Sequence, residues 1–145
     1  MSTIAAISTS PGVGGIGIVR LSGENTFKVI EKIFKPLKKQ TIKGYTMQYG
    51  HIIDKNNNII DEVLVSYFIK PKSYTTEDMC EINSHGNNII LKQILELCIE
   101  NGAVLAMPGE FTQRAFLNGR IDLTQAESVI DLINAKSEKE KESAI

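Results

Sequence analysis

Three charged side chains lie in segments with apolar neighbours, which makes them the strongest candidates for chemistry in this sequence. Arg20 lies in the segment GIVRL, Glu81 in MCEI and Arg120 in NGRI. A charge that is shielded from water costs free energy unless an opposite charge or a ligand compensates it. The three residues are therefore candidates for a binding site. The alternatives are a structural Arg–Glu ion pair or exposure at the edge of a strand.

A glycine-rich segment, residues 11–17, formally contains the GxGxxG pattern of dinucleotide-binding loops. That pattern binds a pyrophosphate because its glycines open a helix whose N-terminus faces the phosphates. Here the following residues, IVRL, predict a strand, so the basis for phosphate binding is missing. The sequence also lacks the GxxxxGKS or GxxxxGKT motif of nucleotide triphosphatases. We expect these glycines to allow a tight bend or a close approach of the backbone to a neighbour.

Histidine and cysteine are too sparse to form a metal site. The two histidines, His51 and His85, and the two cysteines, Cys80 and Cys98, show no ligand spacing. We expect His85, at the entry to a helix, to satisfy backbone groups, and both thiols to be buried. No triad of serine, histidine and acid can be assembled, so no catalytic residue and no metal ligand is assigned.

Composition limits the classes of function. The 145 residues are 42% hydrophobic and 23% charged, with a formal net charge of −1. These values are typical of a globular chain, and they do not supply the positive field on which binding to a phosphate backbone depends. The apolar runs are too short for a membrane span, and the N-terminus lacks a secretion signal. We expect a cytoplasmic protein with no membrane partner.

The periodicity of apolar residues predicts an α+β fold, with a mixed β-sheet and packed helices. A helix capped by Ser22 should carry Phe27, Ile30 and Phe34 on one face, and a hairpin turn is expected at residues 55–58. A later helix should end at residues 101–102. Strands are expected at residues 3–7, 16–21, 45–53, 59–68, 77–83 and 104–107.

The C-terminal part predicts two helices. Pro108 is expected to start a short helix that ends at residues 118–119. Asp122 and Gln125 resemble a capping box for a long amphipathic helix. Because this helix needs a partner face and the sequence stops at Ile145, we expect a helical region that continues beyond it.

Four segments carry a resemblance to a known family: residues 3–20, 73–78, 81–86 and 108–127. The last of these reads PGEFTQRAFLNGRIDLTQAE and is the most specific. Together they resemble the N-terminal region of the MnmE (TrmE) family of tRNA-modification GTPases. The resemblance extends over essentially the whole chain.

This resemblance implies two domains. Residues 1–119 would form a folate-binding and dimerisation domain, similar in fold to the folate-binding domain of aminomethyltransferases. Residues 120–145 would be the truncated start of a central helical domain. The glycine segment would then shape a folate pocket or the dimer interface.

The resemblance also implies a ligand, which is 5-formyltetrahydrofolate or another tetrahydrofolate derivative. In the family, the folate contacts fall on the positions of Arg20, Glu81 and Arg120, although the roles of the two arginines are left open. A carboxylate can accept hydrogen bonds from the amino group and ring N–H of a pterin, while the glutamate tail needs cations. The chain departs from the family at four positions. Val13 replaces a basic residue, Thr76 and Asn87 replace glycines, and Arg120 often corresponds to lysine.

The function that the resemblance implies is tRNA modification by a homodimeric GTPase. The parent protein would act with an FAD-dependent MnmG-type partner and add an aminomethyl or carboxymethylaminomethyl group at C5 of a wobble uridine. GTP, Mg and K would bind only in a GTPase domain beyond residue 145. One alternative is a dimerisation module without functional folate binding. Another is a free-standing folate-dependent methyl- or aminomethyltransferase.

Overall fold

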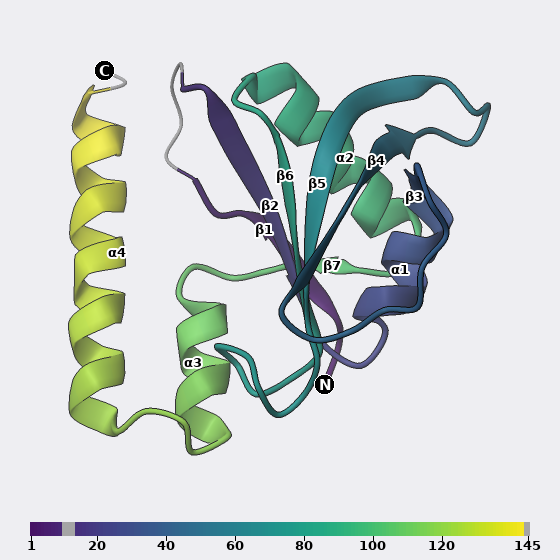
Figure 1. Cartoon of the computed structure of the whole chain (residues 1–145). Coiled ribbons are helices and arrows are strands. Elements are labelled where there is room, and N and C mark those ends of the chain that lie inside the picture. Colours follow the sequence, from purple (N-terminus) through teal and green to yellow (C-terminus); the bar gives the residue numbers. More distant parts are fainter. Residues whose placement is uncertain (10–13, 144–145) are drawn as a thin grey trace. The chain divides into compact units, whose positions relative to one another are not determined.

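The computed structural model describes residues 1–9 and 14–143, which form two compact units (Figure 1). Unit 1 comprises Met1–Ser73 and Glu77–Leu105, and unit 2 comprises Tyr74–Thr76 and Ala106–Ile145. The first part of the glycine-rich segment lies outside the described residues. The predicted domain boundary after residue 119 concerns the family's larger architecture and stays a prediction.

Unit 1 is built on a mixed β-sheet with packed helices, which confirms the predicted α+β class. In the described part of the chain the sheet has 7 strands in the order β3-β4-β5-β6-β2-β1-β7. β1 and β7 pair in parallel, and the other neighbours are antiparallel. The strands are β1 (Ile4–Ile7), β2 (Ile16–Ser22), β3 (Phe34–Pro36), β4 (Thr46–Ile53), β5 (Ile59–Phe68), β6 (Met79–His85) and β7 (Val104–Leu105).

Two helices of unit 1, α1 (Thr26–Ile33) and α2 (Asn88–Glu100), cover one face of this sheet (Figure 1). Their buried residues recur at helical spacing and pack on the strand residues that point to the same side. The opposite face of the sheet is not covered by either of these two helices. The core they form includes Val19, Leu21, Val29, Ile30, Ile33, Ile52, Val63, Val65, Tyr67, Cys80, Ile82, Leu91, Ile94 and Cys98.

The ends of α2 follow standard capping chemistry. Asn87 is the N-cap, and its side chain accepts hydrogen bonds from the backbone N–H groups of Ile89 and Ile90. At the other end Asn101 is the C-cap, and Gly102 has a φ of +113°. The predicted helix end at residues 101–102 is confirmed.

Two predictions for the region around α1 are wrong. Ser22 does not cap the helix, because its hydroxyl donates to Glu77 at 2.7 Å, and the N-cap position is taken by Asn25. Phe34 is not helical but opens the edge strand β3, which pairs with β4. The hairpin prediction holds, since Asn57 has a φ of +62° between β4 and β5.

Unit 2 contains α3 (Glu110–Leu117) and α4 (Leu123–Ser143). Pro108 does not start α3, whose N-cap is Gly109 with a φ of +75°, a left-handed conformation. The capping box is confirmed: Asp122 and Gln125 exchange side-chain to backbone hydrogen bonds of 2.7 and 2.9 Å. No helix among the described residues has the length and apolar character that a membrane crossing demands.

Candidate functional site

Arg20 and Glu81 lie directly opposite each other on the adjacent strands β2 and β6. Arg20 Nε donates to Glu81 Oε2 at 2.9 Å, and Arg20 Nη2 lies 2.8 Å from the same oxygen. The side chains are 30% and 22% exposed, respectively. The structure therefore brings together two of the three predicted residues, although they are 61 positions apart in sequence.

The pair occupies the face of the sheet that α1 and α2 leave uncovered. Because successive strand residues point to opposite faces, Arg20 projects away from the core between the buried residues Val19 and Leu21. Glu81 does the same between Cys80 and Ile82. We refer to this surface, which carries Arg20, Glu81, Ser66, Asn83, Leu64 and Tyr49, as the open face.

The open face combines polar groups with exposed apolar side chains. Asn83 donates from Nδ2 to the Leu64 carbonyl at 3.0 Å and to Ser66 Oγ at 3.4 Å. Leu64 and Tyr49 remain 42% and 38% exposed beside them. A hollow of ≈ 230 Å³ lies among these residues, next to Ile16. Such a surface offers both hydrogen bonds and apolar contact to a flat ligand.

Glu81 keeps hydrogen-bonding capacity that its partner does not use. Arg20 Nε and Nη2 both contact Oε2, and Oε1 receives no hydrogen bond from any residue that the structure describes. An ionised carboxylate has about four lone-pair positions. Glu81 can therefore accept further donors while Arg20 balances its charge.

The glycines near this surface allow close approaches. A Cβ on Gly17 would lie 2.5 Å from a side-chain carbon of Leu91 in α2, and a Cβ on Gly86 would lie 2.1 Å from the Gly14 carbonyl oxygen. β2 begins at Ile16, so the glycines are followed by a strand, as predicted. Gly17 shows the close approach to a neighbour that is expected of the glycine-rich segment, and Gly86, outside that segment, makes a similar one.

His85 is held by a residue that the sequence did not single out. Its Nδ1 lies 2.8 Å from Asp61 Oδ1, and its backbone N–H donates to Asp61 Oδ2 at 2.9 Å. The hydrogen bond to Asp61 raises the pKa of His85, while the ring stays 68% exposed. The prediction that His85 satisfies backbone groups was wrong, because its ring contacts a carboxylate. A buried acid within the alternating strand β5 was the signal that could have revealed Asp61.

Arg120 lies in unit 2 and has different neighbours. Its guanidinium lies 5.5 Å from the ring centroid of Tyr74, a cation–π geometry. Tyr74 in turn shares a 2.9 Å hydrogen bond with Thr112 through its hydroxyl. Arg120 is exposed, so the inference that its apolar neighbours limit its access to water was wrong. The apolar neighbours did not bury it because it follows the end of α3, beyond the C-cap Asn118.

The loop beside Tyr74 has an unusual backbone. Thr76, at a position where the resemblance leads us to expect glycine, has a φ of +69°. This left-handed conformation is unfavourable for a β-branched residue. The preceding carbonyl, that of Thr75, accepts a 2.8 Å hydrogen bond from Asn118 Nδ2 in the same unit.

The cysteines are buried, as predicted. Burial raises the pKa of Cys98 to about 12 and also raises that of Cys80. Both thiols therefore stay protonated near neutral pH. Among the described residues there is no group of three or more potential metal ligands.

Comparisons with known proteins agree on one family. A family model described as GTP-binding protein TrmE N-terminus matches residues 3–120. The chain is similar to the tRNA modification GTPase MnmE of Acetivibrio thermocellus, with 56% identity over 99% of this chain and 32% of the relative. It is also similar to the proteins of that name from Thermoanaerobacter sp. strain X514 and Levilactobacillus brevis. The Thermoanaerobacter protein is 59% identical over 93% of this chain and 30% of its own length. The Levilactobacillus brevis protein is 55% identical over 99% of this chain and 31% of its own length.

The chain thus spans about a third of the length of the curated relatives it matches. The match to the family model covers four fifths of the chain and includes Arg20, Glu81 and Arg120. The chain belongs to the family of TrmE N-terminal domains, which its relatives carry as part of tRNA modification GTPases named MnmE.

Proposed function

We propose that this chain binds a tetrahydrofolate derivative, 5-formyltetrahydrofolate being the first candidate, on the open face of unit 1. The observation that carries the proposal is the Arg20–Glu81 pair, in which one carboxylate oxygen is engaged and the other is available. Leu64 and Tyr49 supply apolar surface on the same face of the sheet. A ring with paired donors matches this combination of groups.

Glu81 would bind the pterin and the arginines would hold anionic or ring groups. The amino group and adjacent ring N–H of a pterin present two parallel donors, which suit a carboxylate acceptor such as Glu81. Arg20 holds the carboxylate in position during this contact and balances its charge. Arg120 already packs on Tyr74 through its planar guanidinium, so it is suited to a flat ligand or to the glutamate tail.

The wider role that we propose rests on the relatives' printed name, tRNA modification GTPase, and for its details on the family resemblance alone. The parent protein would be a cytoplasmic homodimeric GTPase for tRNA modification, using GTP, Mg and K in a domain beyond residue 145. With an FAD-dependent MnmG-type partner it would modify C5 of a wobble uridine with an aminomethyl or carboxymethylaminomethyl group. This chain would hold the one-carbon donor and contribute to dimerisation, and its fold would be similar to the folate-binding domain of aminomethyltransferases.

Isothermal titration calorimetry with 5-formyltetrahydrofolate tests the proposed site. Glu81→Gln keeps the shape of the side chain but replaces one acceptor oxygen by a donor. Charge-assisted hydrogen bonds contribute about 1.5–3 kcal/mol each, so we expect the Kd to rise by roughly 10- to 100-fold. Glu96→Gln, an exposed acid on α2 at the opposite face of the sheet, is the matched control and should leave the Kd unchanged. Binding that is unaffected by Glu81→Gln would refute the assignment.

A second candidate function is a dimerisation module without functional folate binding. Its support is that Arg20 and Glu81 already neutralise each other without a ligand. Light scattering that shows a dimer, combined with calorimetry that shows no heat for any tetrahydrofolate, would favour this second function over the first.

A further inference from the structure

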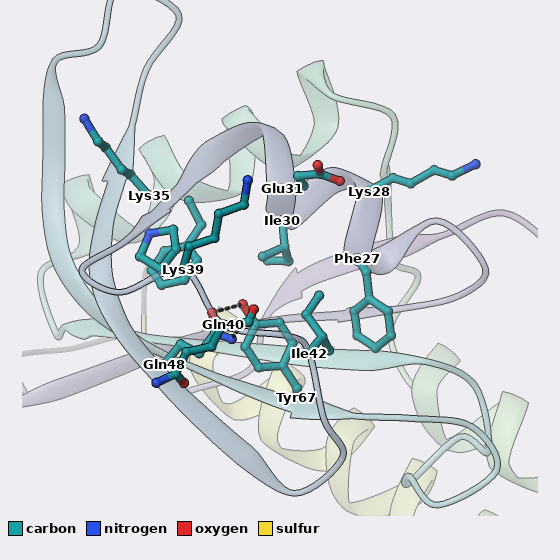
Figure 2. Close-up of a pocket in the computed structure, with 12 residues that line it drawn as sticks. Phe27, Lys28, Ile30, Glu31, Lys35, Lys39, Gln40, Ile42, Gln48 and Tyr67 are labelled. Atoms are coloured by element: carbon teal, nitrogen blue, oxygen red, sulfur yellow. Dashed lines mark hydrogen bonds between the residues drawn. The ribbon is translucent and has the colours of Figure 1, made fainter.

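A cavity of ≈ 600 Å³ lies in unit 1 beside α1, on the opposite side of the sheet from the open face (Figure 2). Its inner wall is formed by the apolar residues Phe27, Ile30, Phe34 and Ile42 together with the ring of Tyr67. We call it the α1 cavity. Its volume lies within the range of about 300–1,000 Å³ that is typical of small-molecule sites.

The segment in which the chain leaves α1, Phe34–Pro36, lines part of the cavity. The helix passes directly into β3, and Gly50 in β4 lets β3 approach so closely that a Cβ there would lie 2.3 Å from the Lys35 carbonyl oxygen. The chain then arches over the cavity as a loop, residues 37–45. This loop is fixed at its start, where the Leu37 N–H donates to the Tyr49 carbonyl at 2.9 Å. Ile42 belongs to this loop, and its side chain forms part of the apolar wall (Figure 2).

The polar groups at the base of the cavity already have partners. The Tyr67 hydroxyl donates to Gln48 Oε1 at 3.2 Å, and Gln48 Nε2 donates to the Gln40 carbonyl at 3.4 Å. Burial also raises the pKa of Tyr67, so its hydroxyl stays neutral and does not repel anions. The interior therefore selects for an apolar group. Selectivity for charge must come from the rim.

The rim is positively charged. Among the residues that line the cavity, Lys28, Lys35 and Lys39 are opposed by a single acid, Glu31, so the lining carries a formal charge of 3 − 1 = +2. Figure 2 shows the Lys39 side chain reaching along the rim toward Glu31, whereas the amino groups of Lys28 and Lys35 point outward. Lys39 is thus the cation best placed to meet a ligand's charged group.

We propose that the α1 cavity is a second ligand site, independent of the folate proposal, and that it binds a small amphipathic anion. The ligand would insert an apolar ring system among Phe27, Ile30 and Ile42, and its single anionic group would stay at the rim near Lys39. This arrangement matches the apolar inner wall, the satisfied polar base and the excess of positive charge at the mouth.

The test compares two fluorescent probes of similar shape in the whole chain. 8-Anilinonaphthalene-1-sulfonate carries one anionic group, and N-phenyl-1-naphthylamine lacks it. We expect the anionic probe to bind more tightly and to shift the amide NMR signals of residues 27–48. Ile42→Trp, which fills the cavity, should abolish binding of both probes. Unchanged near-UV circular dichroism shows that the dye reports on the folded protein.

Variants of opposite sign test the role of charge. Lys39→Gln should weaken the anionic probe about two- to fivefold, as expected for an exposed charge contact, and Glu31→Gln should strengthen it. Neither should change binding of the neutral probe, and Lys55→Gln, far along the sheet in the β4–β5 turn, should change neither. Equal effects on both probes would overturn the proposal. So would binding that survives Ile42→Trp or signals that shift only on the open face.

Discussion

Replacing Gly50 by alanine should destabilise unit 1, because this position is where the edge strand β3 lies closest to β4. The added Cβ would lie 2.3 Å from the Lys35 carbonyl oxygen and 2.7 Å from Pro36 Cα, both of them backbone atoms. Neither atom can move aside as the end of a flexible side chain would. β3 must therefore separate from β4, weakening the Pro36 to Gly50 pairing.

The expected loss follows from two opposing terms. Overpacking of a tightly packed site costs about 1–3 kcal/mol, while replacing glycine by alanine stabilises by about 0.4–1 kcal/mol through the unfolded chain. The net change in the free energy of unfolding is then a loss of roughly 1–2 kcal/mol, which corresponds to a fall in Tm of about 2–8 °C.

Urea denaturation followed by circular dichroism measures this change. Gly44→Ala is the matched control, because its Cβ would meet nothing closer than 3.7 Å and should be neutral or slightly stabilising. If Gly50→Ala unfolds at the same urea concentration as the parent chain, the close approach of β3 does not constrain the fold and the reasoning is wrong.

Three further predictions concern backbone strain, a titrating pair and a helix cap. Thr76→Gly should raise the free energy of unfolding by about 0.5–1 kcal/mol, because relief of the left-handed backbone strain exceeds the entropy cost of glycine. A Tm that stays the same or falls would contradict this. Asp61→Asn should lower the pKa of His85 in an NMR titration. In the parent chain, the stability that the His85–Asp61 pair contributes is complete below 6.5, the pKa of His85 in the unfolded chain. It is lost as the pH rises through the raised pKa of His85 in the folded chain. If Asp61→Asn leaves the dependence of stability on pH unaltered, this prediction is wrong. Asn87→Ala should cost about 0.5–2 kcal/mol in chemical denaturation, whereas Asn88→Ala, one residue further, should cost nothing.

Much of the fold follows from local patterns in the sequence. Strand-like apolar runs predicted β2, β4 and β5, and the capping box at Asp122 and Gln125 marked the start of α4. The edge strand β3 was missed because Lys35 followed by Pro36 is a typical helix-ending sequence. Its pairing depends on Gly50, a contact that is distant in sequence.

The candidate site was predictable to the extent that it rests on strand residues. An arginine and an acid that interrupt apolar strands indicated Arg20 and Glu81, and an ion pair was one of the expected outcomes. Arg120 was identified for a reason that the structure does not support, since it is exposed. The contact of Asp61 with His85 and the α1 cavity escaped prediction because each depends on strand register and on loop packing.

The direct passage from α1 into β3 has a mechanical consequence. Phe34 ends the helix, where its N–H donates to the Ile30 carbonyl, and at the same time it pairs with Ile52 in the sheet. No flexible linker separates the two elements, so the last turn of α1 and the edge of the sheet must open and close as one cooperative unit. A molecule entering beside α1 therefore meets a rigid wall on the helix side, and the covering loop is the part of the enclosure that can yield.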